Sequence, residues 1–294
     1  MAPTYQDSSS DRKDKRGLPT DMPVHDVGRL LCDWRRRRRM SQFDLACAAE
    51  ISTRHLSFLE TGRSRPSRQM MLRLATTLQV PLRDRNALLA AAGFATTFQE
   101  HPFNAPALDV VRRNVESLLA THAPNPALAV DRHWTMLTAN RAVAHLVAGA
   151  EPMLLRPPVN VVRLFLHPAG LASRIVNLAQ WRAHTIERLR RQIDASGDPV
   201  LTDLLEEVRD YTSHGTDRPE DDAVALPLRL ATFDGVLSFF NTTTSFATPL
   251  DITVAELTVE TFLPADLETA AIMRRVSAGD ETRFAAAQPV DALA

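Results

Sequence analysis

The chain has 294 residues, of which 45% are hydrophobic and 23% charged, and its formal net charge is −1. This length and composition predict about two globular domains and exclude a fibrous or wholly disordered protein. No segment approaches the run of about 18 apolar residues that a membrane-spanning helix needs, and none resembles a signal peptide, so we expect a cytoplasmic protein with no membrane partner.

The N-terminal segment differs in composition from the rest. Residues 1–23 are polar and include the run SSSDRKDKR, which predicts a disordered tail. Residues 27–40 predict a first helix, because apolar side chains recur there at helical spacing: Val27, Leu30, Leu31 and Trp34. This helix ends in five arginines, Arg35 to Arg39. The run is read either as a solvated helix end or as a source of attraction for phosphate groups.

The stretch MSQFDLACAAEISTRHLSFLETGRSRPS, residues 40–67, predicts two short helices joined by a tight turn. Ser41 and Ser52 are expected N-caps, and Asp44 stands where a capping box has its acidic residue. Glu50 begins the turn and Gly62 follows the second helix. The apolar side chains that would pack the two helices are Leu45, Ala46, Ala49, Ile51, Leu56 and Leu59. The pattern is that of a helix-turn-helix.

This packing leaves a set of polar side chains free for DNA. Those at the start of the second helix are placed to reach base edges in a major groove, and those flanking it are placed to contact phosphates. The predicted DNA-binding residues are Gln42, Ser52, Thr53, Arg54, His55, Ser57, Arg63, Arg65 and Ser67.

Charge distinguishes a DNA-binding module from an ordinary helical hairpin. Between Val27 and Arg73 there are 11 arginines and 4 acidic residues, a net charge of +7 in a chain whose total is −1. Such an asymmetry indicates a nucleic-acid-binding module joined to an ordinary acidic domain. We therefore expect double-stranded DNA as a partner.

Residues 27–94 resemble the lambda-repressor/Cro-like (Xre) family of helix-turn-helix proteins. The similarity lies in the Ser-Gln start, the Leu-Ala pair, the Ile-Ser turn and the LSFLETGRSRPS run. The family often has glycine in the turn where this chain has Glu50, a difference of about 1 kcal/mol if φ is positive there. The resemblance implies a compact five-helix DNA-binding domain, which we place at residues 24–100. Cys32 and Cys47 lie within it and are expected to be buried free thiols.

The fourth and fifth helices of that domain are predicted from Ser67 and at residues 82–92, and a Pro-bearing linker follows at 101–108. The second domain, at 109–278, mixes helical and strand patterns, and a tail is predicted at 279–294. Helices are expected at 110–121, 140–147, 159–166, 172–195, 199–211 and 265–276. Strands are expected at 127–130, 135–138, 224–232, 236–244 and 253–263. The fold class is therefore α+β, with a five-stranded antiparallel sheet and helices over one face.

A sheet covered by helices can enclose a ligand. The candidate lining residues are the large apolar side chains Trp134, Met136, Phe165, Trp181, Phe239, Phe240 and Phe246, with Arg163, His167 and Arg182 as candidate polar anchors. Ordinary core packing is the alternative role for each of the apolar residues. The sequence has no phosphate-binding glycine loop, nucleophile elbow or metal-spaced His/Cys cluster, so we predict no catalytic residues, no metal and no cofactor.

The second domain resembles the ligand-binding domain of MmyB-like transcription regulators, which has a PAS-like fold. The segments that carry the resemblance are VRRNVESLLATHAPNPALAVDRHWTMLTANRAVAHLVAG, which includes Asn140, and FDGVLSFFNTTTSFATPLDITVAELTVETFLPAD. The resemblance implies a bacterial transcription regulator whose effector is a small apolar molecule, with a fatty acid as the expected ligand. The resemblance of the first domain to the Xre family, whose operators are usually two-fold, implies a homodimer that sets two recognition helices about 34 to 36 Å apart. In the alternative reading, the second domain serves dimerisation or partner binding without a small molecule.

Overall fold

The computed structural model describes residues 25–211 and 225–283. The predicted N-terminal tail and the first residue of the strand expected at 224–232 lie outside these ranges, as do residues 284–294 of the predicted C-terminal tail. The described residues form two compact units. The first comprises the residues up to Leu78 with Ala87–Ala95, and the second comprises Gln79–Asn86 with the residues from Thr96 onward.

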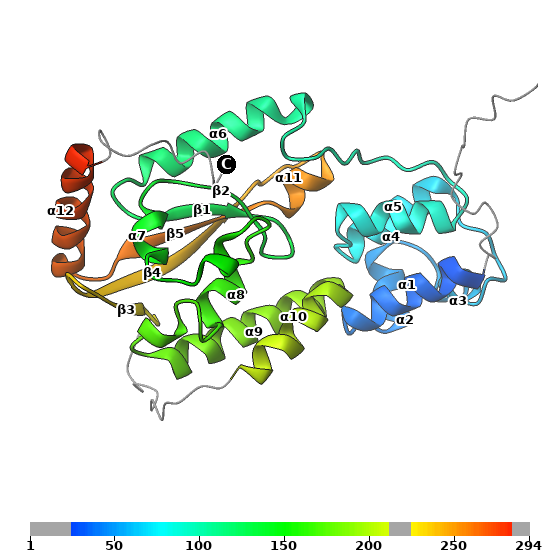
Figure 1. Cartoon of the computed structure of the whole chain (residues 1–294). Helices are drawn as coiled ribbons and strands as arrows, with labels where there is room; N and C mark the ends of the chain where they lie inside the picture. Colours follow the sequence, from blue (N-terminus) through cyan, green and yellow to red (C-terminus); the bar gives the residue numbers. More distant parts are fainter. Residues whose placement is uncertain (1–24, 212–224, 284–294) are drawn as a thin grey trace, which may run out of the picture. The chain divides into compact units, whose positions relative to one another are not determined.

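The N-terminal region contains the five predicted helices (Figure 1). They are α1 (His25–Arg37), α2 (Gln42–Ala48), α3 (Thr53–Glu60), α4 (Arg68–Thr77) and α5 (Leu82–Ala91). Leu31, Leu45, Leu56 and Leu74 come from four different helices, and none is more than 1% exposed. Full burial of a leucine contributes about 1.5 to 3 kcal/mol. A shared apolar core therefore holds these short helices together.

Three of these helices begin at a serine cap. The hydroxyl oxygens of Ser41 and Ser52 accept hydrogen bonds from the backbone N–H groups of Asp44 and His55, both at 3.1 Å. Ser67 caps α4 in the same way. The Asp44 carboxylate accepts the Ser41 N–H in return at 2.9 Å, so the capping box is complete. These bonds satisfy N–H groups that a helix start otherwise leaves unpaired, and the predicted caps are confirmed.

Helices α1 and α3 approach each other closely at a glycine. A Cβ atom added to Gly28 would lie 2.4 Å from the carbonyl oxygen of Glu60 and 2.7 Å from that of Leu59. Both atoms belong to the backbone at the end of α3, so they cannot move aside as a flexible side chain would. The absence of a side chain at this position therefore permits the crossing.

The second unit is built on one antiparallel sheet of five strands, as predicted. The strands are β1 (Ala127–Val130), β2 (Met136–Ala139), β3 (Leu228–Thr232), β4 (Gly235–Ser245) and β5 (Thr258–Pro264). Their order across the sheet is β2-β1-β5-β4-β3. The last strand in the sequence, β5, is therefore the central one, and it pairs with β1 on one side and β4 on the other.

Successive side chains of β1 point to opposite faces of the sheet and pack in two different cores. Ala127 and Ala129 of β1 pack with α6 (Asp109–Thr121), whereas Leu128 and Val130 face a larger cluster on the other side of the sheet. Helices contributing to that larger cluster are α7 (Val143–Val147), α8 (Val161–Leu166), α9 (Leu178–Ser196), α10 (Pro199–Asp210) and α12 (Leu267–Arg283). Short 3₁₀ helices occur at Pro106–Leu108, Pro152–Leu155 and Ala172–Arg174. Helices therefore cover both faces of the sheet, not one face as expected, with α6 on one and α8 to α10 on the other (Figure 1).

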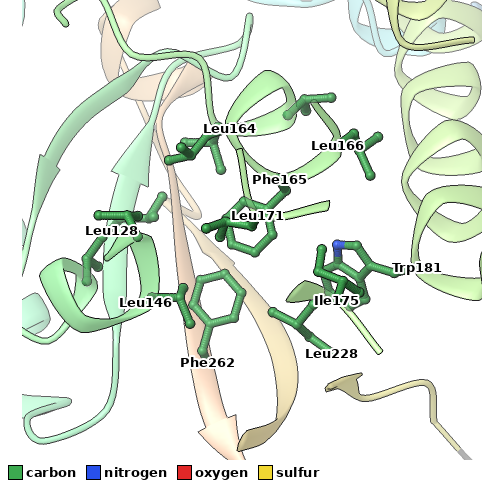
Figure 2. Packing of buried hydrophobic residues seen from close by; sticks show 14 of the residues in the cluster. Leu128, Leu146, Leu164, Phe165, Leu166, Leu171, Ile175, Trp181, Leu228 and Phe262 are labelled. Carbon is green, nitrogen blue, oxygen red and sulfur yellow. The ribbon is translucent and has the colours of Figure 1, made fainter. Parts of the chain in front are cut away.

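Aromatic rings fill the centre of the larger cluster (Figure 2). Phe165 of α8 stacks on Phe262 of β5 with their ring centroids 5.7 Å apart and their planes 6° from parallel. Trp181 of α9 lies 6.4 Å from Phe165, and Phe239 of β4 meets Phe262 edge to face. These contacts fix α8 and α9 against the central strands.

Two elements of this domain were predicted partly wrongly, each at its start. Residues 253–256, expected to start a strand, belong to the helix α11 (Ile252–Glu256), which Asp251 caps by accepting the Thr253 N–H at 2.9 Å. The single helix expected at 172–195 is interrupted, because Ile175 pairs with Leu230 and the Val176 N–H donates to the Arg229 carbonyl. Hydrogen bonds to the edge strand β3 replace helical ones here, so α9 begins only at Leu178.

Smaller differences concern ends of elements. Asn140 was expected to open a helix, but α7 begins at Val143, because the Asn140 amide bonds the backbone of Ala127, Leu119 and Asn125. The last helix, expected at 265–276, continues to Arg283. Both cysteines are free thiols, but neither is buried: Cys32 is half-buried and Cys47 is exposed, on the outer side of α2.

Candidate DNA-binding surface and ligand cavity

The turn between α2 and α3 has the left-handed geometry that the family usually gives to glycine. Glu50 has φ of 54°, and the next residue, Ile51, returns its N–H to the carbonyl of Ala46 at 2.9 Å. A non-glycine residue in this region costs on the order of 1 kcal/mol. The surrounding packing outweighs that cost, and the two helices keep the helix-turn-helix arrangement.

One buried carboxylate connects three helices of this motif. Glu60, whose side chain is 4% exposed, accepts from Arg35 Nε at 2.6 Å and from Arg35 Nη2 at 2.8 Å. Gln42 Nε2 donates to the same carboxylate at 2.7 Å. Burial alone would raise the pKa of Glu60, but the hydrogen bonds from Arg35 and Gln42 outweigh it and hold the pKa below its ordinary value. Glu60 is therefore ionised at neutral pH and structural in role.

The five-arginine run does not act as one solvated surface. Arg35 is buried against Glu60, and Arg38 donates to the carbonyl of Leu78 at 2.8 Å. The guanidinium groups of Arg37 and Arg38 also stack on Trp34, at 5.0 and 5.3 Å from the ring centroid. Reading the whole run as a solvated end or a phosphate contact was wrong for Arg35, because its partner Glu60 lies 25 residues further on.

Around α3 the other arginines are exposed. Thr53 and Arg54 stand in the first turn of α3 and are exposed, while His55 and Ser57 are half-buried. The Arg54 guanidinium lies 5.3 Å from the centre of the Phe58 ring, a cation–π contact on the helix surface. Arg63 and Arg65 follow α3 in an exposed loop. This face therefore carries positive charge and polar side chains at the start of a helix whose opposite face is buried.

The second unit contains a small cavity of about 40 Å³ between α8, α9 and the sheet. One face of α9 lines it with Trp181, His184, Thr185 and Arg188. The remaining lining residues are Trp134, Val161, Val162, Phe165, Asn241, Glu260 and Phe262. Because a water molecule needs about 10 to 15 Å³ and ligand pockets usually measure about 300 to 1,000 Å³, a larger ligand would have to displace side chains.

The polar end of the cavity is an ion pair. Arg188 Nη2 and Nη1 donate to the two oxygens of Glu260 at 2.6 and 3.0 Å, and the Glu260 side chain is 2% exposed. The hydroxyl of Thr243 donates to the same carboxylate and accepts from Arg188 at 2.7 Å. On its other side, the Arg188 guanidinium lies 4.4 Å from the centroid of the Trp134 ring. Arg188 is therefore held between a carboxylate and an aromatic face.

Trp134 reaches the cavity from a strained backbone position. Its φ is 66°, in the turn between β1 and β2, where Asp131 accepts the N–H groups of both His133 and Thr135. A bulky residue in this region costs on the order of 1 to 3 kcal/mol. The indole N–H donates to Gln192 of α9 at 2.8 Å, which fixes the ring over Arg188. Glycine would suit the turn, but only an aromatic side chain supplies this wall of the cavity.

Comparison with known proteins decides what the two units are. Residues 111–276, more than half of the chain, match the family described as MmyB-like transcription regulator ligand binding domain. The chain belongs to the MmyB-like transcription regulators. Residues 26–88 match a helix-turn-helix domain, so this MmyB-like protein is a transcription regulator with a DNA-binding domain and a ligand-binding domain.

Other comparisons add less. No curated protein matches the MmyB-like chain. The crystal structure of the clp gene regulator ClgR from C. glutamicum is 28% identical, with the match covering 24% of this chain and 88% of that chain at a TM-score of 0.21. The structure of an RNA-binding light-oxygen-voltage receptor is 12% identical, covering 88% of this chain and 64% of that chain at a TM-score of 0.25.

The predicted DNA-binding residues of the MmyB-like regulator fall into two groups. The side chains of Thr53, Arg54, His55, Arg63 and Arg65 make no hydrogen bond to any described residue, and these residues gather around α3. The hydroxyl oxygens of Ser52 and Ser67 cap helices, the Gln42 amide donates to Glu60, and Ser57 lies half-buried in α3. Phe43 was not among the predicted DNA-binding residues, and it is 65% exposed near the start of α2.

The predicted ligand residues are more scattered. Trp134, Phe165 and Trp181 line the cavity together, Phe239 is fully buried beside it, and Met136 packs against the same core. Phe240 and Phe246 do not line it. Phe240 has the opposite orientation in β4 from Phe239, and both Phe240 and Phe246 are more than a third exposed.

The three predicted polar anchors lie outside the cavity lining. Arg163 forms an ion pair with Glu207 at 2.7 Å, and Arg182 donates to the carbonyls of Val208 and Arg209. His167 meets the ring of Tyr211 edge to face. The polar groups that do line the cavity, Arg188 and Glu260 above all, were missed. A signal for Arg188 existed, because Trp181, His184, Thr185 and Arg188 follow one helical stripe.

Within 25–211 and 225–283, no group of three or more His, Cys, Asp or Glu side chains is placed to hold a metal ion. Over the same ranges, none of the helices combines the length and the apolar character needed to cross a bilayer.

Proposed function

We propose that this regulator recognises a specific operator through the first turn of α3, and that a small, largely apolar molecule in the α9 cavity alters its affinity for that operator. The observation that carries the first part is the exposed Thr53–Arg54 pair on a helix anchored by buried Leu56 and Leu59. The second part is supported by the mainly aromatic lining of the cavity in the MmyB-like domain.

On the DNA, the two groups of exposed residues have different tasks. Arg54 and Thr53 read base edges, since side chains at the start of a recognition helix reach into the major groove. Arg63 and Arg65 bind phosphates and set the position of the protein without reading sequence. Two protomers present two such helices about 34 to 36 Å apart, on successive major grooves of a two-fold operator.

In the second domain, Trp134, Phe165, Trp181 and Phe262 form an apolar wall that favours an apolar ligand body. A fatty acid belongs to this class and is the first compound to test. Occupation changes DNA affinity only if the ligand binds one arrangement of the dimer more tightly than another.

The decisive experiment has two steps. Full-length protein is purified, extracted with organic solvent and examined by mass spectrometry, and selection from a random DNA library supplies the operator. Fluorescence anisotropy then measures operator affinity with and without the extracted compound. A compound that changes the Kd for the operator, but not for random DNA, supports the proposal. An empty protein whose DNA affinity responds to no apolar compound would refute its ligand half and leave the DNA half in place.

A second candidate function for the C-terminal domain is dimerisation without a ligand. It is favoured by apolar side chains on the outer face of β4 and β5, where Phe240 pairs with Leu263 and each is 37% exposed, near Val236 at 40%. Sedimentation analysis of the full chain and of a Phe240→Ser, Leu263→Ser variant tests this candidate function. A variant that becomes monomeric assigns the dimer contact to this face.

A further inference from the structure

The charge state of the ligand follows from the ionisable side chains around the cavity. Of the described lining residues, Arg188, Glu260 and His184 are the ones that ionise. Arg188 and Glu260 form a bidentate pair with their charges opposed. Burial lowers the pKa of His184 below its ordinary value, and the charges of Arg188 and Arg191 lower it further. At neutral pH the lining therefore carries no net charge.

An anionic ligand would have to take Arg188 from its partner. Glu260 is almost completely buried and relies on Arg188 for two of its hydrogen bonds. Removing one partner of a buried ion pair shifts an equilibrium by roughly a hundredfold or more, because the other charge is left uncompensated. A ligand carboxylate that did not displace Glu260 would instead lie beside it and meet its negative charge.

Uncharged polar groups remain available in the same place. Asn241 uses its side-chain oxygen to accept from Arg188 at 3.3 Å, while its NH₂ group makes no hydrogen bond to any described residue. The His184 ring lies beside Trp181 with a ring-centroid distance of 5.8 Å, and within the described ranges its nitrogens make no hydrogen bond. An amide NH₂ donates, and a neutral imidazole offers one donor and one acceptor.

From this arrangement we infer that the cavity selects an uncharged ligand: a mostly apolar molecule with a hydrogen-bond acceptor, such as an amide, ester or ketone oxygen, directed at Asn241. This inference rests on the proposed ligand-binding function and narrows it. It predicts that a free fatty acid binds more weakly than its neutral derivatives of the same chain length. The Arg188–Glu260 pair acts as the element that rejects the charged form.

Two probes of equal length, decanamide and decanoate, test the inference by isothermal titration calorimetry at neutral pH with the full-length protein. Decanamide is expected to bind at least tenfold more tightly than decanoate. The Glu260→Gln variant keeps the shape of the side chain but leaves the charge of Arg188 uncompensated. Its preference is expected to reverse, with decanoate at least tenfold tighter. The Arg188→Gln, Glu260→Gln double variant has no uncompensated charge, and it should prefer decanamide as the wild type does.

The outcomes separate this inference from the proposed function. Wild-type protein that binds decanoate as tightly as decanamide, or more tightly, overturns the inference and leaves ligand binding intact. A Glu260→Gln variant without reversal also overturns it. If neither probe binds to the wild type or to either variant, the proposed ligand-binding function fails, and the inference fails with it. Should Glu260→Gln not fold, the wild-type comparison of decanamide with decanoate still decides.

Discussion

Arg35 and Glu60 are 25 residues apart in the sequence and form a two-pronged ion pair, with Nε–Oε1 and Nη2–Oε2 distances of 2.6 and 2.8 Å. Arg35 Nη1 also donates to the Met40 carbonyl, and Gln42 donates to Glu60. One carboxylate at the end of α3 therefore holds the end of α1 and the start of α2. The orientation of the recognition helix depends on it.

Arg35→Ala should destabilise the DNA-binding unit by about 3 to 5 kcal/mol, because it leaves the buried Glu60 carboxylate without an opposite charge. Arg36→Ala is the matched control, since Arg36 is exposed, and it should change stability by less than about 0.5 kcal/mol. Urea unfolding followed by Trp34 fluorescence measures both, in a background where the other two tryptophans, Trp134 and Trp181, are phenylalanine. Equal effects of the two variants would contradict the structural role of Arg35.

The same pair predicts how acid affects stability. The pKa of Glu60 is lowered in the folded state, so its contribution is fully present above the unfolded-state pKa of about 4.3. That contribution is lost as the pH falls through the lower folded-state value. Urea unfolding at a series of pH values should show a steeper loss below about pH 4 for the wild type than for Glu60→Gln. Parallel curves would show that Glu60 does not contribute.

For Gly28→Ala, the structure predicts the direction of the change in folding stability. Within a helix, replacing glycine by alanine ordinarily stabilises by about 0.5 to 1 kcal/mol. Here the new Cβ would lie 2.4 Å from the Glu60 carbonyl oxygen, and overpacking of this kind costs about 1 to 3 kcal/mol. We expect a net loss of stability and weaker operator binding. A Gly28→Ala protein with a higher urea midpoint would show that α1 and α3 can separate without penalty.

Arg54 and Arg63 should affect DNA binding in different ways. Arg54→Ala is expected to weaken operator binding by about 1 to 3 kcal/mol and to relax the preference at one base position, while random DNA is bound nearly as before. Arg63→Ala should weaken both DNAs about equally and reduce the slope of log K against log salt by roughly one. Anisotropy titrations over a range of salt distinguish these results. A uniform effect of Arg54→Ala would remove it from the base-reading set.

The strain at Trp134 can be measured by comparing two truncations. Trp134→Ala and Trp134→Gly both remove the ring and its bond to Gln192, but only glycine relieves the positive φ. The glycine variant should therefore be more stable than the alanine variant by about 1 kcal/mol, whereas at an ordinary position it would be less stable. Urea unfolding monitored by circular dichroism provides the comparison.

Sequence reasoning succeeded best where structure is decided locally. The caps of α2, α3 and α4 depend on serines three residues before the N–H they bind, and that spacing is legible in the sequence. Arg35 shows the limit of this reasoning. It stands in a run that looks solvated, and only the fold reveals that Glu60 lies beside it.

The ligand domain shows the same limit more strongly. Large apolar residues were recognised, and Trp134, Phe165 and Trp181 do meet at one cavity. Arg188 and Glu260 were not recognised as cavity residues, because the two partners are 72 residues apart and each alone resembles a surface charge. Phe240 was predicted to line the cavity together with Phe239, although adjacent strand residues point to opposite faces of the sheet. At 253–256 a β-prone run became a helix, since Asp251 caps it.

The close approach at Gly28, together with the buried carboxylate of Glu60, has a consequence for regulation. Helix α1 is in van der Waals contact with the backbone of α3, and α2 is hydrogen-bonded to Glu60 at the end of α3. The DNA-binding domain therefore has little freedom to bend internally. In the proposed dimer, an effector that alters DNA binding must then act on the spacing or orientation of whole DNA-binding domains. Its signature would be a change in the preferred distance between half-sites, with the sequence read inside each half-site unchanged.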